Sequence, residues 1–267
     1  MKNVLTIAGS DSCGGAGVQA DLKTFSALGT YGMSVITAIT AQNTTGVKMV
    51  REMDEEIVRE QINCLFEDIE IHAVKIGMVS SVSIIDTIGT CLQEKHTPIV
   101  LDPVMVSKSG CHLLKPESTQ ELVKVLFPLA RVVTPNLFEA EVITGEKIQN
   151  LAQMQAAAVK IHELGAGNVV VKGGHLTGDA IDVMFDGKDF KFIKGTRINT
   201  TNTHGTGCTF SSAIAAYLAR GCDVYDAVEK AKVYINGAIE NSLELGHGVG
   251  PTYHFYKFYN KAGELNG

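Results

Sequence analysis

The sequence predicts an α/β protein in which a mostly parallel β-sheet is buried under helices. Short runs of aliphatic and β-branched residues alternate along the chain with segments whose apolar residues recur at helical spacing. Several of the strand-like runs are nearly continuous apolar stretches, as expected when both faces of a sheet are covered. Hydrophobic residues make up 45% of the 267 positions, which is enough for a substantial core.

Six strands are expected, and helical patterns lie between them. The strands are residues 4–8, 33–40, 73–76, 98–101, 131–134 and 168–172. The helices are residues 18–28, 55–66, 82–93, 117–126, 137–144 and 154–164. An order of strand and then helix predicts parallel strands joined by right-handed crossovers. The acidic residues 54–56 are interpreted as the start of a solvated helix face.

The last third of the chain departs from this alternation. Residues 180–185 and 190–193 predict an antiparallel hairpin near one edge of the sheet, joined by a turn that contains Gly187. A long helix is expected to begin at Cys208, and a second to follow Asp223, with Asp226 completing a cap-like pair. No repeat, linker-like stretch or low-complexity segment divides the chain, so we expect residues 1–267 to form one domain.

Composition excludes several classes of protein. No apolar run approaches the roughly 18 residues that a transmembrane helix needs. The net charge of −6 and the absence of a Lys/Arg cluster argue against nucleic acid or an anionic membrane as a partner. The first nine residues lack the long apolar region of a signal peptide, which predicts an untargeted start.

The six cysteines are irregularly spaced and form no C-x-x-C pair: Cys13, Cys64, Cys91, Cys111, Cys208 and Cys222. In a chain of this length this pattern favours reduced thiols and a cytoplasmic protein, and it argues against a zinc site.

A Gly-rich segment, residues 10–17, follows the first strand. Gly15 and Gly17 match G-x-G-x-x-A, a pattern of dinucleotide-binding proteins. However, the glycines lie about seven residues beyond the strand, and no Asp or Glu between Asp21 and Glu52 could hold a ribose. We therefore interpret the segment as a flexible loop over a small ligand.

A second Gly-rich segment, residues 202–208, opens the first of the two long helices. Gly205 and Gly207 allow consecutive backbone N–H groups to point at one spot, and the helix N-terminus adds a partial positive charge. This predicts an anion hole suited to a phosphate, with a tight turn before a helix as the alternative. The chain has no G-K-[ST], so a Walker A loop is excluded.

Polar residues also end three further strands. Asn136 and Glu139 are three residues apart, and Asp102 ends a neighbouring strand. Because ligands bind beyond the carboxyl ends of parallel strands, an amide and two carboxylates there could hold Mg²⁺. A polar pair on the surface is an equal alternative for Asn136 and Glu139. Lys172, in the segment Lys172-Gly173-Gly174-His175, could place an ammonium group beside phosphates.

Taken together, these motifs resemble the hydroxymethylpyrimidine/phosphomethylpyrimidine kinases of thiamine biosynthesis, the vitamin-kinase branch of the ribokinase-like superfamily. The resemblance extends from about residue 4 to about residue 255. It rests on residues 6–11 (TIAGSD), 14–24 (GGAGVQADLKT), 102–105 (DPVM), 134–140 (TPNLFEA), 172–175 (KGGH), 204–209 (HGTGCT) and 246–251 (GHGVGP).

The resemblance implies a three-layer α-β-α sandwich and a kinase. The γ-phosphoryl group of ATP would pass first to 4-amino-5-hydroxymethyl-2-methylpyrimidine and then to its monophosphate. Gly205, Thr206 and Gly207 would form the anion hole, and Cys208 would be the catalytic base, where many superfamily members have Asp. As a thiol at the first turn of a helix, Cys208 is expected to have a lowered pKa.

The same resemblance assigns the two ends of the site. Asp102 and Glu139 would handle Mg²⁺, and Asn136 would serve the metal and the phosphates with them. Lys172 and Lys232 would serve the nucleotide. The pyrimidine would be bound by Gly9, Asp21, Gln42 and Met78. The Gln42 amide suits a ring nitrogen beside an amino group, and Asp21 could accept from that amine. Met78 could equally be a core residue.

Two alternatives stay open. A pyridoxal kinase of the same branch is disfavoured by residues 41–43, Ala-Gln-Asn, since relatives that prefer pyridoxal look more apolar at position 42. A non-catalytic pyrimidine- or nucleotide-binding sensor would have no use for a base beside an anion hole. By the resemblance, the partners would be a small-molecule substrate and a second copy of the chain in a homodimer.

Overall fold

The computed structural model describes residues 1–105, 114–174 and 180–266. Within these residues, nine strands form one sheet in the order β3-β2-β1-β4-β5-β6-β7-β8-β9. The strands are β1 (Lys2–Asp11), β2 (Thr30–Asn43), β3 (Gly46–Glu52), β4 (Ala73–Ile76), β5 (Ile99–Leu101), β6 (Val132–Val133), β7 (Val169–Val171), β8 (Ala180–Phe185) and β9 (Phe190–Gly195). The six strands β2, β1, β4, β5, β6 and β7 are parallel to one another. At the edges, β3 pairs antiparallel with β2, β8 with β7, and β9 with β8.

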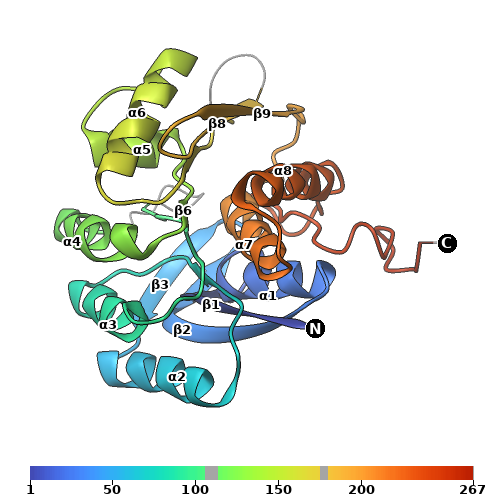
Figure 1. Cartoon of the computed structure of the whole chain (residues 1–267). Coiled ribbons are helices and arrows are strands. Elements are labelled where there is room, and N and C mark those ends of the chain that lie inside the picture. Colours follow the sequence, from blue (N-terminus) through green and yellow to red (C-terminus); the bar gives the residue numbers. More distant parts are fainter. Residues whose placement is uncertain (106–113, 175–179, 267) are drawn as a thin grey trace.

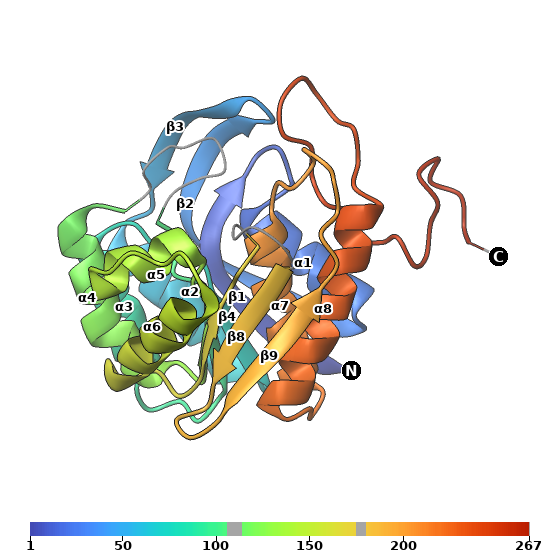
Figure 2. The ribbon, with the colours of Figure 1, turned by 90° about the horizontal axis from the view of Figure 1, so that it is seen from above.

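Helices cover both faces of the sheet. They are α1 (Gly17–Ala27), α2 (Glu55–Asp68), α3 (Val82–Leu92), α4 (Pro116–Leu126), α5 (Leu137–Thr144), α6 (Leu151–Glu163), α7 (Thr206–Ala219) and α8 (Val224–Glu240), with a 3-10 turn at Phe127–Leu129. Figure 1 shows α2 to α6 on one side of the sheet and α1, α7 and α8 on the other. The view from above in Figure 2 shows the sheet between these two layers. The predicted α/β class is confirmed.

Two clusters of buried apolar side chains hold the layers together. One joins α2, α3, α4 and α6 to the sheet and contains Leu5, Ile76 and Leu101. The other joins α1, α7 and α8 to the opposite face and contains Phe25 and Tyr234. Central strands such as β4 and β5 are buried at every residue, which explains their continuous apolar sequence.

Several helices begin where the sequence offers a capping side chain. The carboxylate of Asp54 accepts a hydrogen bond from the N–H of Ile57, and that of Asp223 accepts from Asp226. The interpretation of residues 54–56 as a helix start is therefore confirmed. The long helix predicted from Cys208 begins two residues earlier, at Thr206.

Strand β3 was not predicted. Its burial pattern contains no buried residue, and Met49 is 65% exposed, so it carries neither alternation nor a continuous apolar run. Its hydrogen bonds to residues Ala38–Asn43 of β2 hold it in a strand conformation, and its own sequence pattern does not indicate a strand. Strand β1 also runs to Asp11, so residues 10 and 11 belong to a strand and not to a loop.

No helix among the described residues is long and apolar enough to cross a membrane.

Candidate active site

A cavity of about 1070 Å³ lies along the carboxyl edge of the parallel strands. Residues from β1, β2, the segments after β4 to β7, and helices α7 and α8 line it. It brings together all the site residues predicted from the sequence except Asp21.

The N-terminus of α7 faces the middle of this cavity. Gly205 is its N-cap residue with φ of 77°, and a Cβ there would lie 1.7 Å from the Gly15 carbonyl oxygen, so only glycine fits. A Cβ at Gly207 would lie 3.3 Å from Asp102 Oδ2 and 3.5 Å from Lys172 Nζ. The first turn of α7 thus presents its N–H groups beside a carboxylate and an ammonium group, where an anion can bind.

Cys208 lies in this first turn and lines the cavity. Its predicted low pKa is wrong: burial raises the pKa of the thiol to about 11. The positive charge of Lys75 and the Gly17 N–H oppose the increase, whereas nearby carboxylates add to it. Desolvation of the thiolate therefore outweighs the favourable field of the helix N-terminus at this site.

Asp102 and Lys172 form an ion pair across the strand ends. Lys172 Nζ lies 2.9 Å from Asp102 Oδ1, which also accepts a hydrogen bond from Thr134 Oγ1 at 3.2 Å. The pKa of Lys172 is raised, because burial alone would lower it but the charges of Asp102 and Glu139 outweigh burial. Lys172 therefore stays charged beside the anion hole.

Asn136 and Glu139 form a capping box at the start of α5. The Glu139 N–H donates to Asn136 Oδ1 at 2.9 Å, and the Asn136 N–H donates to Glu139 Oε2 at 2.8 Å. Glu139 is only 3% exposed, so the pair is not a surface feature. Burial, with the charge of Asp102 adding to it, raises the pKa of Glu139 to about 7, although Lys172 opposes the increase.

Lys232 lies at the far end of the cavity on α8. Its Nζ contacts Asp182 Oδ2 at 2.6 Å, and Asp182 Oδ1 accepts a hydrogen bond from the Gly173 N–H at 3.0 Å. The ion pair therefore joins α8 to β8 and to the segment after β7. His175, the last residue of that predicted motif, lies outside the described residues, as does Cys111.

Gly9, Gln42 and Met78 line the opposite end. The Met78 side chain packs against Gly9, where a Cβ would lie 2.3 Å from the Met78 Cε. The side chain of Gln42 contacts the Thr40 hydroxyl and the Nε2 atom of His204, each at 3.3 Å. A thioether and an amide thus share one end of the cavity.

Asp21 does not reach the cavity, so its predicted contact with substrate is corrected. The residue is fully buried on the sheet-facing side of α1. Its two oxygens accept hydrogen bonds from Thr6, Lys75 and Ser212. Because these partners surround the carboxylate, it cannot also accept from a ligand in the cavity.

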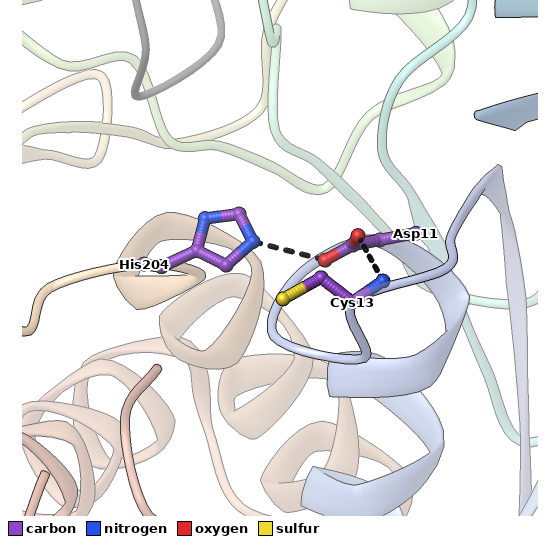
Figure 3. A group of neighbouring side chains, drawn as sticks. All are labelled: Asp11, Cys13 and His204. Atoms are coloured by element: carbon purple, nitrogen blue, oxygen red, sulfur yellow. Dashed lines mark hydrogen bonds and ion pairs between the residues drawn. The ribbon is translucent and has the colours of Figure 1, made fainter. Parts of the chain in front are cut away.

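The predictions missed Asp11, which organises the loop before α1. Its carboxylate accepts from the N–H groups of Cys13, Gly15 and Ala16, and His204 Nε2 lies 2.9 Å from its Oδ2. Figure 3 shows one oxygen of this carboxylate joined to the His204 ring and the other to the backbone nitrogen of Cys13. Burial alone would raise the pKa of Asp11, but hydrogen bonds from His204 and the loop lower it. An Asp just before a Gly-rich turn was the available signal.

Asp11, Cys13 and His204 are also close enough to be considered as metal ligands, since one ligand atom of each lies within 4.8 Å of the others. The hydrogen bonds from the loop already occupy the Asp11 oxygens. We therefore interpret the group as the connection between the loop before α1 and the loop before α7.

Comparison with known proteins agrees with this geometry. Residues 11–253 match the family model described as phosphomethylpyrimidine kinase. The chain belongs to the phosphomethylpyrimidine kinase family. It is therefore an enzyme of the kinase class.

Individual relatives of the family cover nearly the whole chain. A hydroxymethylpyrimidine/phosphomethylpyrimidine kinase from Rhizobium meliloti is 52% identical over 96% of this chain and 97% of its own. A solved phosphomethylpyrimidine kinase from Clostridium difficile is 52% identical with a TM-score of 0.80, covering 90% and 100% of the two chains. An ADP complex of Bacillus subtilis pyridoxal kinase is 43% identical with a TM-score of 0.89, covering 95% and 97%.

Proposed function

We propose that this kinase transfers the γ-phosphoryl group of ATP to 4-amino-5-hydroxymethyl-2-methylpyrimidine, and then a second one to the monophosphate. The product would be the diphosphate used in thiamine biosynthesis. The observation that supports this most is the position of the α7 N-terminus in the cavity. It lies beside a charged pair, Asp102 and Lys172, in a cavity that is also lined by an amide and a thioether, Gln42 and Met78.

In the proposed reaction the substrate hydroxyl oxygen attacks the γ-phosphorus, and the bond to the bridging oxygen of ADP breaks. Backbone N–H groups of Gly205, Thr206 and Gly207 stabilise the charge on the transferred phosphoryl oxygens. Cys208, in its thiolate form, accepts the hydroxyl proton and becomes the thiol. A pKa of about 11 makes that thiolate a strong base present in a small fraction at neutral pH.

Magnesium fits the carboxylates near the anion hole. The pKa of Glu139 is raised by burial and by the charge of Asp102, so a cation shared by both groups would relieve an unfavourable interaction. Asp102 and Glu139 would hold the ion, with Asn136 nearby at the start of α5. When bound, Mg²⁺ would neutralise charge on the phosphate oxygens. Lys172 would contribute to the same neutralisation as a fixed ammonium group.

Lys172, Asn136 and Lys232 are proposed to bind the nucleotide. All three line the cavity on the side of α5, β8 and α8. The ADP complex of the Bacillus subtilis pyridoxal kinase supports an adenine nucleotide as the phosphoryl donor. Gly9, Gln42 and Met78 are proposed to bind the pyrimidine at the other end.

Pyridoxal is the second candidate substrate, because the solved pyridoxal kinase from Bacillus subtilis has a TM-score of 0.89 with this chain. Side-by-side steady-state kinetics with ATP and each alcohol test the choice. We expect the higher kcat/KM with the pyrimidine alcohol, and a higher value with pyridoxal would reverse the assignment. Phosphorus NMR of the pyrimidine products distinguishes one transfer from two. Binding of the pyrimidine alcohol without ATP consumption would contradict the proposed substrate.

The proposal also retains one domain over residues 1–267, a homodimer and a cytoplasmic location. Light scattering on the purified protein tests the dimer, and a monomer mass would contradict it.

A further inference from the structure

A buried ion pair lies beneath the anion hole and is not used in the proposed reaction. Lys75 on β4 and Asp21 on α1 are both 0% exposed, and Lys75 Nζ lies 2.9 and 3.0 Å from the two Asp21 oxygens. Taking two charges out of water is costly, and a buried pair is weak evidence for stability alone. A role for this pair should therefore be sought in what it contacts.

Asp21 connects the pair to the helix that carries Cys208. The Ser212 hydroxyl donates to Asp21 Oδ1 at 2.6 Å, and Ser212 lies four residues after Cys208 on α7. Residues four apart share one helix face, so Asp21 holds the turn directly below the thiol. Helix α1 also contacts the thiol. The N–H of Gly17 interacts with Cys208, and Gly17 lies four residues before Asp21 on α1.

Lys75 supplies a positive charge that acts on both Asp21 and the Cys208 thiol. Its Nζ lies under Gly77 at the end of β4, where a Cβ would approach it to 2.5 Å. Its pKa is raised, because burial alone would lower it but the charges of Asp21, Cys208 and Asp102 outweigh burial. In the described residues, the charged groups that act on the Cys208 thiol include Lys75 from β4, Asp21 from α1, Asp102 from the end of β5 and Lys172 from the end of β7.

We propose that Lys75 and Asp21 are positioning residues for Cys208: the carboxylate fixes the first turns of α7 through Ser212, and the ammonium group sets the proton affinity of the thiol. The inference rests on the proposed role of Cys208 as the base. It predicts effects of opposite sign for the two charges. Without the carboxylate, the ammonium group would favour the thiolate, whereas without the ammonium group the thiolate would lose its counter-charge.

The test measures the rate of Cys208 alkylation by iodoacetamide against pH in the unliganded protein, with peptide mass spectrometry to separate the cysteines. We expect the midpoint to fall by about one pH unit in Asp21→Asn and to rise by a similar amount in Lys75→Met. The pH dependence of kcat/KM should move in the same directions. Lys124→Met, which removes an exposed lysine on α4, is the matched control and should shift neither.

Either single variant could fail to fold, because it leaves one buried charge unpaired. The double variant Lys75→Met/Asp21→Asn removes both charges and keeps the approximate volumes. We expect it to fold with a midpoint between those of the single variants and with kcat reduced at least tenfold. An unchanged alkylation profile in every folded variant, or shifts of the same sign in both single variants, would overturn the proposal. The alkylation assay needs no substrate, so it stays informative even if the pyrimidine is not the substrate.

Discussion

Cys208 is the residue at which local physical chemistry most changes the expected mechanism. Burial raises the pKa of its thiol to about 11, so the thiol form prevails at neutral pH. A loose transition state requires little deprotonation of the attacking alcohol before the new bond forms. A weakly populated but strong base is compatible with such a step, and turnover should then increase with pH until the thiol titrates.

We expect Cys208→Ala to lower kcat by roughly a hundred- to ten-thousand-fold, the usual contribution of general-base catalysis. The affinity for ATP should change little, because the N–H groups of the α7 N-terminus remain. Cys208→Asp should retain some turnover, since a carboxylate can also accept the proton. Steady-state kinetics and nucleotide titration measure both effects. Near-normal turnover of Cys208→Ala with a lower melting temperature would make the cysteine a packing residue.

Gln42 carries the prediction on substrate recognition. Its side chain lines the cavity beside Thr40 and His204. Gln42→Met should lower kcat/KM for the pyrimidine alcohol about ten- to a hundredfold, because unpaired polar groups of a bound ligand cost roughly 1–3 kcal/mol. The KM for ATP should stay the same. An unchanged kcat/KM for the pyrimidine would place Gln42 outside the recognition site.

At the scale of elements, the two loops that precede α1 and α7 act as one unit. Asp11 accepts three N–H groups of its own loop and pairs with His204 of the other. The two loops also meet at Gly205, which packs so closely against the Gly15 carbonyl oxygen that a Cβ at position 205 would not fit. The geometry of the anion hole therefore depends on a carboxylate at the end of β1.

Asp11→Asn tests this dependence. An amide keeps the shape of the side chain but cannot accept at both ends, so part of the loop must lose its partner. We expect kcat to fall at least tenfold, with a melting temperature lowered by a few degrees for a chain of this size, as for a loss of about 1–2 kcal/mol. The matched variant is Asp54→Asn. Asp54 is another carboxylate that accepts a backbone N–H, at the start of α2, and it does not line the cavity. This variant should leave kcat unchanged and change stability little, because Asn caps a helix N-terminus about as well as Asp.

The sequence patterns predicted elements well where burial is uniform and poorly where order depends on pairing. The range of β4, residues 73–76, and that of α5, residues 137–144, were predicted to the residue, because one is wholly buried and the other begins with a capping box. Strand β3 was missed because its residues are exposed and only its partner β2 orders them.

The site divides in the same way. Strand-end motifs located the residues around the cavity, since parallel strands place their carboxyl ends at one edge. They do not show which face of α1 points inward. They therefore predict a ligand contact for Asp21, which instead pairs with Lys75 inside the protein. Nor could they show that desolvation would dominate the helix field at Cys208.

At the scale of the whole molecule, the buried carboxylate of Glu139 links folding to pH. Its pKa is about 7 in the folded protein and 4.5 for an ordinary glutamate. The folded state therefore binds more protons than the unfolded state between these values. By linkage, protonation of Glu139 contributes to the free energy of unfolding. This contribution is fully present below pH 4.5 and is lost as the pH rises through 7.

Glu139→Gln should remove this pH dependence while keeping the cap of α5, because Gln also serves in a capping box. Relative to the variant, the wild-type protein should lose about 3 kcal/mol of unfolding free energy between pH 4.5 and pH 8 in EDTA, at roughly 1.4 kcal/mol for each unit of pKa difference. Urea unfolding curves measure the difference, and Glu163→Gln at the exposed end of α6 controls for the substitution itself. Added Mg²⁺ should stabilise the wild-type protein at pH 8 more than the variant, because a cation held by Glu139 and Asp102 would offset the charge of the ionised Glu139 carboxylate. Parallel pH profiles for wild type and Glu139→Gln would show that this carboxylate titrates normally, and an equal response to Mg²⁺ would remove it from the metal site.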